Sequence, residues 1–392
     1  MIIIFWLSFF IVFYTFAGYG LFLYFLIKVK RALKGRPAIP FVNDELLPEC
    51  TLVVAAYNEE SFIEDKIANC LKLSYPEGKL KLLFITDGSV DRTPDIIRLH
   101  PQIQLLHQPQ RAGKIAAVHR AMEYVNTEIA VFTDANTFLN TDAIRKICRH
   151  YADKTVGCVA GEKRVQIDEN ADASAAGEGF YWKYESALKK WDSELYSVVG
   201  AAGELFSVRR SLYQDVPADT VLDDFMISML IAIKGYRIVY EPEAYAIETA
   251  SENVSEELKR KIRIAAGGIQ SILRLKQLFN PFKYPVLSFQ YVSHRVLRWT
   301  VTPFLLILIF VLNAFLPNNA LYNTIFAAQI LFYLLAFLGY IMEKRQIRVK
   351  ALFVPYYFCV MNYAILMGII RYFTKKQSAA WEKAQRKQGT AN

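Results

Sequence analysis

The sequence predicts an α/β domain, with a mostly parallel sheet and flanking helices, combined with N- and C-terminal transmembrane helices. Two observations predict this fold class. Between residues 51 and 134, short apolar runs alternate with stretches whose apolar residues recur at helical spacing, which is the pattern of parallel strands joined by helical crossovers. Long apolar segments stand at both ends of the chain, and the apolar content of 54% exceeds the about 45–50% typical of soluble proteins.

The first apolar segment, residues 1–27, contains no charged side chain, and basic residues follow it at once, beginning with Lys28 and Lys30. About 20 helical residues suffice to cross the hydrocarbon core of a bilayer. A cleaved signal peptide would carry its positive charge before a shorter apolar core. We therefore expect an uncleaved transmembrane anchor, followed by a basic linker at 28–50 on the cytosolic side.

Further apolar segments follow the central part of the chain. Residues 299–316 and 321–342 are each long enough to be transmembrane helices, and the uncharged turn between them suits the outer face. The stretch before them, 284–298, is predicted to be an interfacial helix. Its end reads SHRVLRW and fits either an amphipathic helix with a specific role or a plain anchor at the membrane surface.

The last apolar run, residues 351–370, allows two interpretations. It contains Pro355 and Asn362 and precedes a basic tail at 371–392. A full transmembrane helix would place that tail outside, against the trend for basic residues to stay in the cytosol. A re-entrant segment would keep the tail inside, but it needs protein around its backbone. The sequence leaves both open.

The central region, residues 51–283, is predicted to be a cytosolic domain. Four apolar runs read as its first strands: 51–55, 80–86, 103–106 and 129–132. Polar residues follow two of them, since Asp87 ends the second strand and Asp134 the fourth. Ligands bind beyond the carboxyl ends of parallel strands, and an acid there can hold a divalent cation against a diphosphate. The alternative is that these residues only form turns.

A second phosphate signal lies at Gly113 and Lys114, which open a helix whose backbone N–H groups favour an anion. There is no P-loop and no GxGxxG motif, so neither a P-loop NTPase nor a nicotinamide enzyme is indicated. Later in the chain, 180–196 is a helix rich in aromatic residues, which suits sugar stacking or core packing equally. At 221–225 two adjacent carboxylates open a helix, where they could act in catalysis or only cap it.

Charge and cysteine content argue against other classes of protein. The net charge of +9 comes largely from residues that flank apolar segments, which favours a membrane protein over a nucleic-acid-binding one. The five cysteines form no CxxC pair and lack zinc-finger spacing with histidine. They are predicted to be free thiols in a reducing compartment.

Taken together, the motifs resemble those of the family 2 glycosyltransferases, and among them the membrane-embedded polysaccharide synthases that make cellulose, hyaluronan or poly-N-acetylglucosamine. The resemblance runs from about residue 51 to residue 268 and rests on the order and spacing of six short motifs. These are VVAAYNEE (53–60), TDGSVDRT (86–93), RAGK (111–114), TDAN (133–136), GELFSVRR (203–210) and LDDF (222–225).

The resemblance implies a nucleotide-diphospho-sugar transferase fold and transfer of a sugar from UDP with inversion. It places Ala56, Tyr57 and Glu59 in the nucleotide pocket, Asp87 at the uracil and ribose, and Lys114 near the nucleotide. Asp134 would bind nucleotide and metal, with Asn136 as the second ligand of Mg²⁺ or Mn²⁺. Arg263 would face the diphosphate, Gly203, Glu204 and Asp223 the acceptor, and Asp224 would be the general base.

These roles agree with the chemistry. An acceptor hydroxyl is a weak nucleophile, so a carboxylate has to take its proton, and a departing UDP has to be stabilised by positive charge. Successive side chains at a helix start diverge, so only Asp224 of the adjacent pair is assigned as base.

The sequence departs from the family pattern at three places. The metal motif has Asn136 where the family has Asp, which removes one charge, and Asp223 replaces Glu. The processive members carry QxxRW after the base, whereas residues 260–264 read RKIRI. Arg263 is retained, but Ile264 stands in place of the tryptophan near the acceptor sugar, so processivity stays open.

The sequence therefore predicts a multi-pass, UDP-sugar-dependent inverting glycosyltransferase in a bacterial-type inner (plasma) membrane, with a cytosolic catalytic domain. Its expected product is a polysaccharide of the exopolysaccharide or capsule type. The alternatives are transfer of a single sugar to a lipid or lipid-linked acceptor, and a non-catalytic sugar-nucleotide-binding membrane subunit. Expected partners are the donor, a sugar or lipid-linked acceptor and the bilayer, but no nucleic acid, with a homo-oligomer or an export partner left open.

Overall fold

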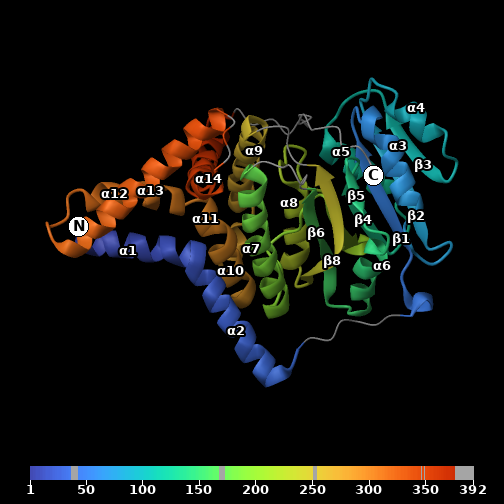
Figure 1. The fold of residues 1–392 in the computed structure, drawn as a ribbon. Coiled ribbons are helices and arrows are strands. Elements are labelled where there is room, and N and C mark those ends of the chain that lie inside the picture. The colour runs from blue at the N-terminus through green and yellow to red at the C-terminus, as the bar shows by residue number, and fades with distance from the viewer. Residues whose placement is uncertain (37–42, 167–172, 250–253, 346, 348, 376–392) are drawn as a thin grey trace. The chain divides into compact units, whose positions relative to one another are not determined.

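The computed structural model describes residues 1–36, 43–166, 173–249, 254–345, 347 and 349–375 (Figure 1). The chain divides into two compact units. We call them the sheet unit, formed by the described residues within 30–166 and 189–249, and the helical unit, formed by those within 1–29, 173–188 and 254–375.

The described part of the sheet unit contains one eight-stranded sheet in the order β3-β2-β1-β4-β7-β6-β8-β5. Its first half is parallel: β1 pairs with β2 and β4, and β2 pairs with β3. These strands are β1 (Cys50–Ala56), β2 (Leu80–Asp87), β3 (Ile103–Gln108) and β4 (Ile129–Asp134). The four predicted strands and their parallel pairing are thus confirmed.

The second half of the sheet is mixed. β7 runs antiparallel to both β4 and β6, whereas β6 and β8 are parallel and β5 is antiparallel to β8. Its members are β5 (Thr137–Leu139), β6 (Val156–Gln166), β7 (Leu205–Arg209) and β8 (Arg237–Thr249). Of these, β5 and β8 were not predicted from the sequence. β5 follows Asp134 after a two-residue turn, so its pairing with β8 holds the chain just beyond β4.

Helices cover the sheet and bury its apolar strands. They are α3 (Glu60–Leu71), α4 (Thr93–Arg98), α5 (Lys114–Tyr124), α6 (Ala143–Cys148) and α8 (Asp223–Ile233). The core includes Leu52, Val54 and Phe84 from the strands and Ile63 and Ile67 from α3. β1 is buried at every residue, which is why it reads as one continuous apolar run rather than as an alternating one.

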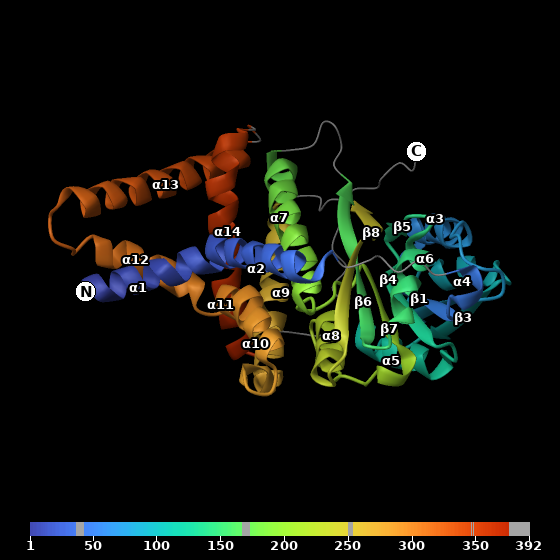
Figure 2. The same cartoon turned by 90° about the horizontal axis from the view of Figure 1, so that it is seen from below.

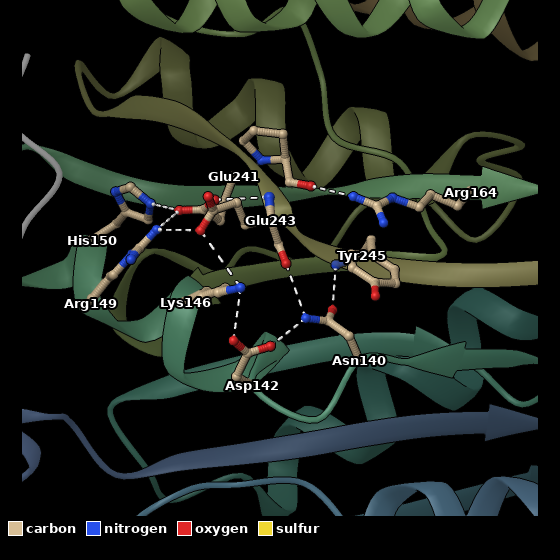
Figure 3. A network of polar contacts seen from close by, with 10 residues as sticks. Asn140, Asp142, Lys146, Arg149, His150, Arg164, Glu241, Glu243 and Tyr245 are labelled. Atoms are coloured by element: carbon tan, nitrogen blue, oxygen red, sulfur yellow. Dashed lines mark hydrogen bonds and ion pairs between the residues drawn. The ribbon is translucent and has the colours of Figure 1, made fainter. Parts of the chain in front are cut away.

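A polar network joins α6 and the short helical turn η3 (Arg149–Ala152) to β8 (Figure 3). Glu241 accepts hydrogen bonds from Arg149 at 2.6 Å and from His150 at 2.7 Å. Burial raises the pKa of Glu241, but these two hydrogen bonds outweigh it and lower the pKa to about 2. The backbone N–H of Tyr245 donates to Asn140 Oδ1 at 2.8 Å. β8, the partner of β5, is therefore firmly attached at this edge.

The helical unit contains three helices that are long and apolar enough to cross a membrane, among the described residues. The first spans Ile2–Lys34 and consists of α1 (Ile2–Phe13), the π-helical turn η1 (Tyr14–Gly18) and α2 (Tyr19–Lys34). Figure 1 shows a bend between α1 and α2 at this turn, as is common at π-helical turns. The other two are α13 (Ala320–Lys344) and α14 (Lys350–Phe373).

The segment predicted as a transmembrane helix at 299–316 differs from expectation. α12 (Thr302–Asn313) has 12 residues, about 18 Å of helix, which is less than the roughly 30 Å of a bilayer core. It meets the helical stretch Pro285–Trp299 at 58°, and the two together form up to one further span. That stretch consists of α10 (Pro285–Tyr291), η6 (Val292–Val296) and α11 (Leu297–Trp299). By contrast, 351–370, for which two interpretations were open, lies within the unbroken helix α14.

Two segments expected in the 51–283 domain group with the helical unit instead, namely residues 173–188 of α7 (Ala173–Leu195) and α9 (Val254–Arg274). The Tyr184 hydroxyl donates to the backbone carbonyl of Phe16 at 2.9 Å. α9 lies beside α14 (Figures 1 and 2), and a Cβ added at Gly368 would lie 2.5 Å from the Cβ of Ala265. Side-chain contacts of these kinds explain the grouping.

Candidate active site

The loops that follow β1, β2, β3 and β4 gather at one edge of the sheet, because the four strands are parallel. Ala56 is the buried last residue of β1, Asp87 ends β2 and Asp134 ends β4. Such an edge is where ligands bind in sheets of this kind. The nucleotide-side residues predicted from the sequence therefore come together.

The loops after β1 and β2 are joined by hydrogen bonds. Asn58 adopts a left-handed backbone conformation, with φ at 53°, which asparagine tolerates better than most residues. Its N–H donates to Ser89 Oγ at 3.2 Å, and its Oδ1 accepts from the N–H of Val90 at 2.9 Å. The N–H of the buried Glu59 donates to Thr93 Oγ1 at 2.9 Å. These bonds hold the Tyr57–Glu59 segment beside the loop of Asp87.

Asp87 is buried and accepts backbone hydrogen bonds from the loop after β3. Its Oδ2 lies 3.0 Å from the N of Ala112 and 2.6 Å from the N of Gly113. Gly113 has φ at 99°, a conformation that glycine adopts readily. Asp87 therefore fixes the turn that starts α5 and carries Lys114. Its predicted contact with uracil and ribose stays a prediction.

Arg111 was part of a quoted motif but received no role from the sequence. Its guanidinium carbon lies 4.0 Å from the centroid of the Tyr57 ring, and Nη1 donates to the Tyr57 hydroxyl at 3.3 Å. A cation over an aromatic face is an attractive arrangement. The position of Arg111 also explains why residue 88 is a glycine. Gly88 has φ at 70°, and a Cβ there would lie 2.6 Å from the Cβ of Arg111.

Lys114 connects the metal motif to the acidic start of α8. Its Nζ lies 2.8 Å from Asp134 Oδ1 and 3.9 Å from Asp223 Oδ2. Burial acts to lower the pKa of Lys114, but the charges of Asp134 and Asp223 raise it well above its ordinary value. The side chain is therefore an ammonium ion held between two carboxylates.

Asp224 lies in the first turn of α8 beside these groups. Its Oδ1 accepts from the N–H of Phe225 at 2.8 Å. Burial, together with the charge of Asp223, raises the pKa of Asp224 to about 7, which is near the optimum for a group that takes up a proton at neutral pH. A Cβ added at Gly203 would lie 3.3 Å from Asp224 Oδ2 and 3.5 Å from Lys114 Nζ. Gly203 thus leaves the carboxylate open on that side.

Comparison with known proteins identifies the domain. The family model described as Glycosyl transferase family 2 matches residues 51–216. Residues 51–216 thus form a domain that matches the family 2 glycosyltransferases.

The glycosyltransferase domain is part of a longer resemblance. The poly-beta-1,6-N-acetyl-D-glucosamine synthase of Staphylococcus aureus (strain COL) is 26% identical over 265 residues, which cover 65% of this chain and 62% of that protein. The synthase of the same name from Staphylococcus epidermidis is 24% identical over 261 residues, 64% of this chain and 61% of that protein. The chain is thus related to polysaccharide synthases over somewhat less than two thirds of their length.

A solved structure shares the fold of almost the whole chain. It is the mannosyltransferase PcManGT from Pyrobaculum calidifontis in complex with GDP-Man and Mn²⁺. The match has a TM-score of 0.71 and 22% identity, and it covers 95% of this chain and 100% of the other. The predicted fold class, a nucleotide-sugar transferase sheet with apolar helices at both ends, is therefore confirmed.

The residues of the glycosyltransferase domain fit a divalent cation at the turn after β4. Asp134 and Asn136 lie in one turn and are each half-buried. Among the described residues, no group of three or more His, Cys, Asp or Glu side chains could hold a metal by itself. One carboxylate and one amide oxygen suit Mg²⁺ or Mn²⁺ when phosphate oxygens and water supply the remaining ligands.

Glu204, predicted on the acceptor side, belongs to a buried ionic group that the sequence did not reveal. Its carboxylate lies 2.6 Å from Lys163 Nζ, and Lys163 also pairs with Glu248. The backbone carbonyl of Glu204 accepts from Thr133 Oγ1 at 2.9 Å. Glu204 is therefore tied both to β6 and to the metal motif. Lys163 reaches Glu248 because β6 and β8 are neighbouring parallel strands, in which Lys163 pairs with Ala246, two residues before Glu248. Local sequence does not indicate this contact.

Arg263 is the one predicted site residue that lies outside the sheet unit, since α9 belongs to the helical unit. Its contact with the diphosphate stays a prediction. On the same helix, a Cβ added at Gly268 would lie 2.5 Å from the ring of Trp299. Gly268 is one helical turn beyond Ile264 and shares its face. An aromatic ring therefore packs on α9 near the position where the family's tryptophan is missing.

Proposed function

We propose that this protein is a membrane-bound inverting glycosyltransferase that uses a UDP-sugar to build a polysaccharide of the exopolysaccharide or capsule type. The observation that carries this proposal is the position of Lys114, whose ammonium group contacts Asp134 and lies near Asp223, with Asp224 next along the chain. A site for a diphosphate and a candidate base are thereby adjacent, as glycosyl transfer from a nucleotide donor requires.

In the proposed reaction, the acceptor hydroxyl oxygen forms a bond to the anomeric carbon while the bond from that carbon to the diphosphate oxygen breaks. The hydroxyl proton passes to Asp224, and the electron pair of the broken bond leaves with UDP. Attack from the face opposite the leaving group inverts the anomeric carbon. The ammonium group of Lys114 would stabilise the negative charge of the departing diphosphate. A bound Mg²⁺ or Mn²⁺, held by Asp134 and Asn136, would neutralise further charge there.

The apolar helices support a membrane location. We infer a multi-pass protein of a bacterial-type plasma membrane with a cytosolic sheet unit, because Lys28, Lys30 and Arg31 follow the first apolar segment. The three to four candidate spans among the described residues are few for a polymer channel. This favours either an assembly of several copies or an export partner, or the alternative of a single transfer to a lipid-linked acceptor.

One experiment separates these functions. Full-length protein in lipid nanodiscs would be incubated with radiolabelled UDP-N-acetylglucosamine, UDP-glucose, UDP-galactose or GDP-mannose and Mn²⁺, and the product would be sized. A long product from one UDP-sugar is the expected result. A product one sugar longer than a lipid acceptor would replace polymer synthesis by single transfer. Activity only with GDP-mannose, the nucleotide sugar in the PcManGT structure, would overturn the donor assignment. Nucleotide binding without turnover would indicate a non-catalytic subunit.

The pH dependence of the reaction should report Asp224. With its pKa raised to about 7, the carboxyl group is protonated and inactive as a base below that pH. We expect log kcat/KM to rise with unit slope up to about pH 7 and then to level off. The measurement is initial-rate kinetics at constant ionic strength. A profile that is already flat between about pH 5 and 6 would contradict a raised pKa for the essential base.

A further inference from the structure

Lys66 is a charged residue in a position where charge is rarely found. It lies on α3, between the apolar residues Ile63 and Ile67, and its exposed fraction is 0%. Its Nζ donates to the backbone carbonyl of Thr137 at 2.6 Å and to Thr133 Oγ1 at 3.2 Å. Both acceptors belong to the ends of β4 and β5 that flank Asp134 and Asn136.

No carboxylate pairs with Lys66 within 4.0 Å in the part of the chain that the structure describes. Burying an ammonium ion without an anionic partner costs free energy, and an apolar residue of similar length would avoid this cost. The burial of Lys66 therefore requires an explanation other than stabilisation of the core.

The acceptors around Lys66 supply that reason. Thr137 Oγ1 donates to the backbone carbonyl of Asp134 at 3.0 Å, and Thr133 Oγ1 donates to that of Glu204 at 2.9 Å. The two hydroxyl oxygens lie 3.0 Å apart. Two hydroxyl protons are thus directed to two carbonyls. The ammonium ion of Lys66 adds a donor both to the Thr137 carbonyl and to Thr133 Oγ1.

Asn69 adds a second attachment from the same helix, three residues further on and hence on the same face. Its Nδ2 donates to the carbonyl of Leu139 at 2.8 Å, and its Oδ1 accepts from the N–H of Leu139 at 2.9 Å. Both backbone groups of one β5 residue are thereby bound by one side chain. β5 has three residues, too few to fix the turn by strand pairing alone.

We propose that Lys66 and Asn69 are positioning residues of the donor site, which hold the turn between β4 and β5 so that Asp134 and Asn136 face the metal–diphosphate group of the nucleotide sugar. The inference rests on the proposed function. Neither side chain is assigned a contact with the donor. Each acts through the backbone of the turn, as outer-sphere partners of metal ligands commonly do.

The test compares nucleotide binding with and without metal. In full-length protein, Lys66→Met keeps the apolar length of the side chain but removes the donor and the charge. UDP affinity would be measured by isothermal titration with Mn²⁺ and with EDTA. We expect the gain in affinity that Mn²⁺ provides to fall roughly tenfold, while affinity in EDTA stays within about twofold. An equal loss under both conditions would show a general structural role and overturn the proposal.

Two further variants make the result decisive. Cys70 is a buried core residue of α3, four residues from Lys66. Cys70→Ala removes packing there, and the Mn²⁺ effect of this variant should equal that of the wild type. Asn69→Asp keeps the acceptor for the Leu139 N–H but loses the donor, and should behave like Lys66→Met. If Lys66→Met fails to fold, Asn69→Asp carries the test, and an undiminished Mn²⁺ effect in it would overturn the proposal.

Hydrogen exchange separates this proposal from the proposed function. In Lys66→Met and Asn69→Asp, the backbone amides of residues 134–139 should exchange faster than in Cys70→Ala, without any ligand. If wild-type protein shows no Mn²⁺-dependent UDP binding, the donor assignment fails, yet faster exchange would still establish the two residues as supports of the turn. Unchanged exchange in both variants would overturn that support even in an active enzyme.

Discussion

Asp224→Asn is expected to reduce kcat by about 10²–10⁴-fold while UDP affinity stays within about twofold. The substitution preserves shape and the acceptor for the Phe225 N–H, but an amide does not take up the acceptor's proton. Because a general base acts only as the hydroxyl attacks, loss of the proposed base should appear in kcat rather than in donor binding. The measurements are single-turnover transfer and UDP titration on the same preparation.

The matched control is Asp223→Asn, the neighbouring carboxylate that lies 3.9 Å from Lys114. Asp223→Asn should reduce kcat less than Asp224→Asn does. By lowering the repulsion on Asp224, it should also move the pH profile to lower pH.

Thermal stability provides a check on folding. A carboxyl whose pKa is raised in the folded state favours folding at acid pH, and this contribution is lost as pH rises through about 7. Asp224→Asn should therefore unfold at a higher temperature than the wild type at pH 8. Turnover near the wild-type level would remove Asp224 as the base.

Asp134→Ala is expected to abolish the effect of Mn²⁺ on UDP affinity and to lower kcat/KM by roughly 10²-fold or more. The change removes the only carboxylate of the metal motif and also the partner of Lys114 at 2.8 Å. The measurement is UDP titration with Mn²⁺ and with EDTA. If the Mn²⁺ effect were as large as in the wild type, the cation would have to bind elsewhere.

Asn136→Asp serves as the complementary variant. It restores a carboxylate at the position where the family motif has one, so Mn²⁺ should bind at lower concentration than in the wild type. If Asp134→Ala loses the Mn²⁺ effect while Asn136→Asp leaves the midpoint of the Mn²⁺ titration unchanged, Asn136 is not a ligand. The two variants thus test the two predicted ligands separately.

The sequence predicted the parallel half of the sheet because its central strands, β1 and β4, are buried along almost their whole length and read as apolar runs. β5 and β8 escaped prediction for different reasons. β5 has three residues, fewer than a periodic pattern needs. β8 carries Arg237, Glu241, Pro242 and Glu243, and its pairing with β6 breaks register near Glu162. Strands of that composition are stabilised by side-chain contacts with distant segments, which local sequence does not reveal.

In the candidate site, the motifs led to the prediction that four residues converge on one cleft: Asp87, Asp134, Asp224 and Arg263. Lys114 contacts Asp134 and lies near Asp223, the neighbour of Asp224, and Asp87 binds the turn that carries Lys114. Arg263 belongs to the helical unit, so its part in the cleft stays a prediction. The supporting residues were not predictable in this way. Lys66 interrupts the apolar face of α3 and looks like an ordinary surface residue in the sequence. Its contacts with the turn between β4 and β5 are apparent only in the structure. Lys163 and Glu204 are 41 residues apart and meet only through the antiparallel pairing of β6 and β7. Their roles depend on tertiary structure.

The close approach of α14 to α9 has a practical consequence for anyone who wishes to prepare this protein. Around Gly368 the two helices touch without room for a single methyl group, and Ala265, Ala266 and Ile269 of α9 are buried. Cutting the gene before α14 would leave these residues facing solvent and would favour precipitation. Preparations in detergent or lipid should therefore retain α14, even though it lies more than a hundred residues after the last motif of the candidate site, at 222–225.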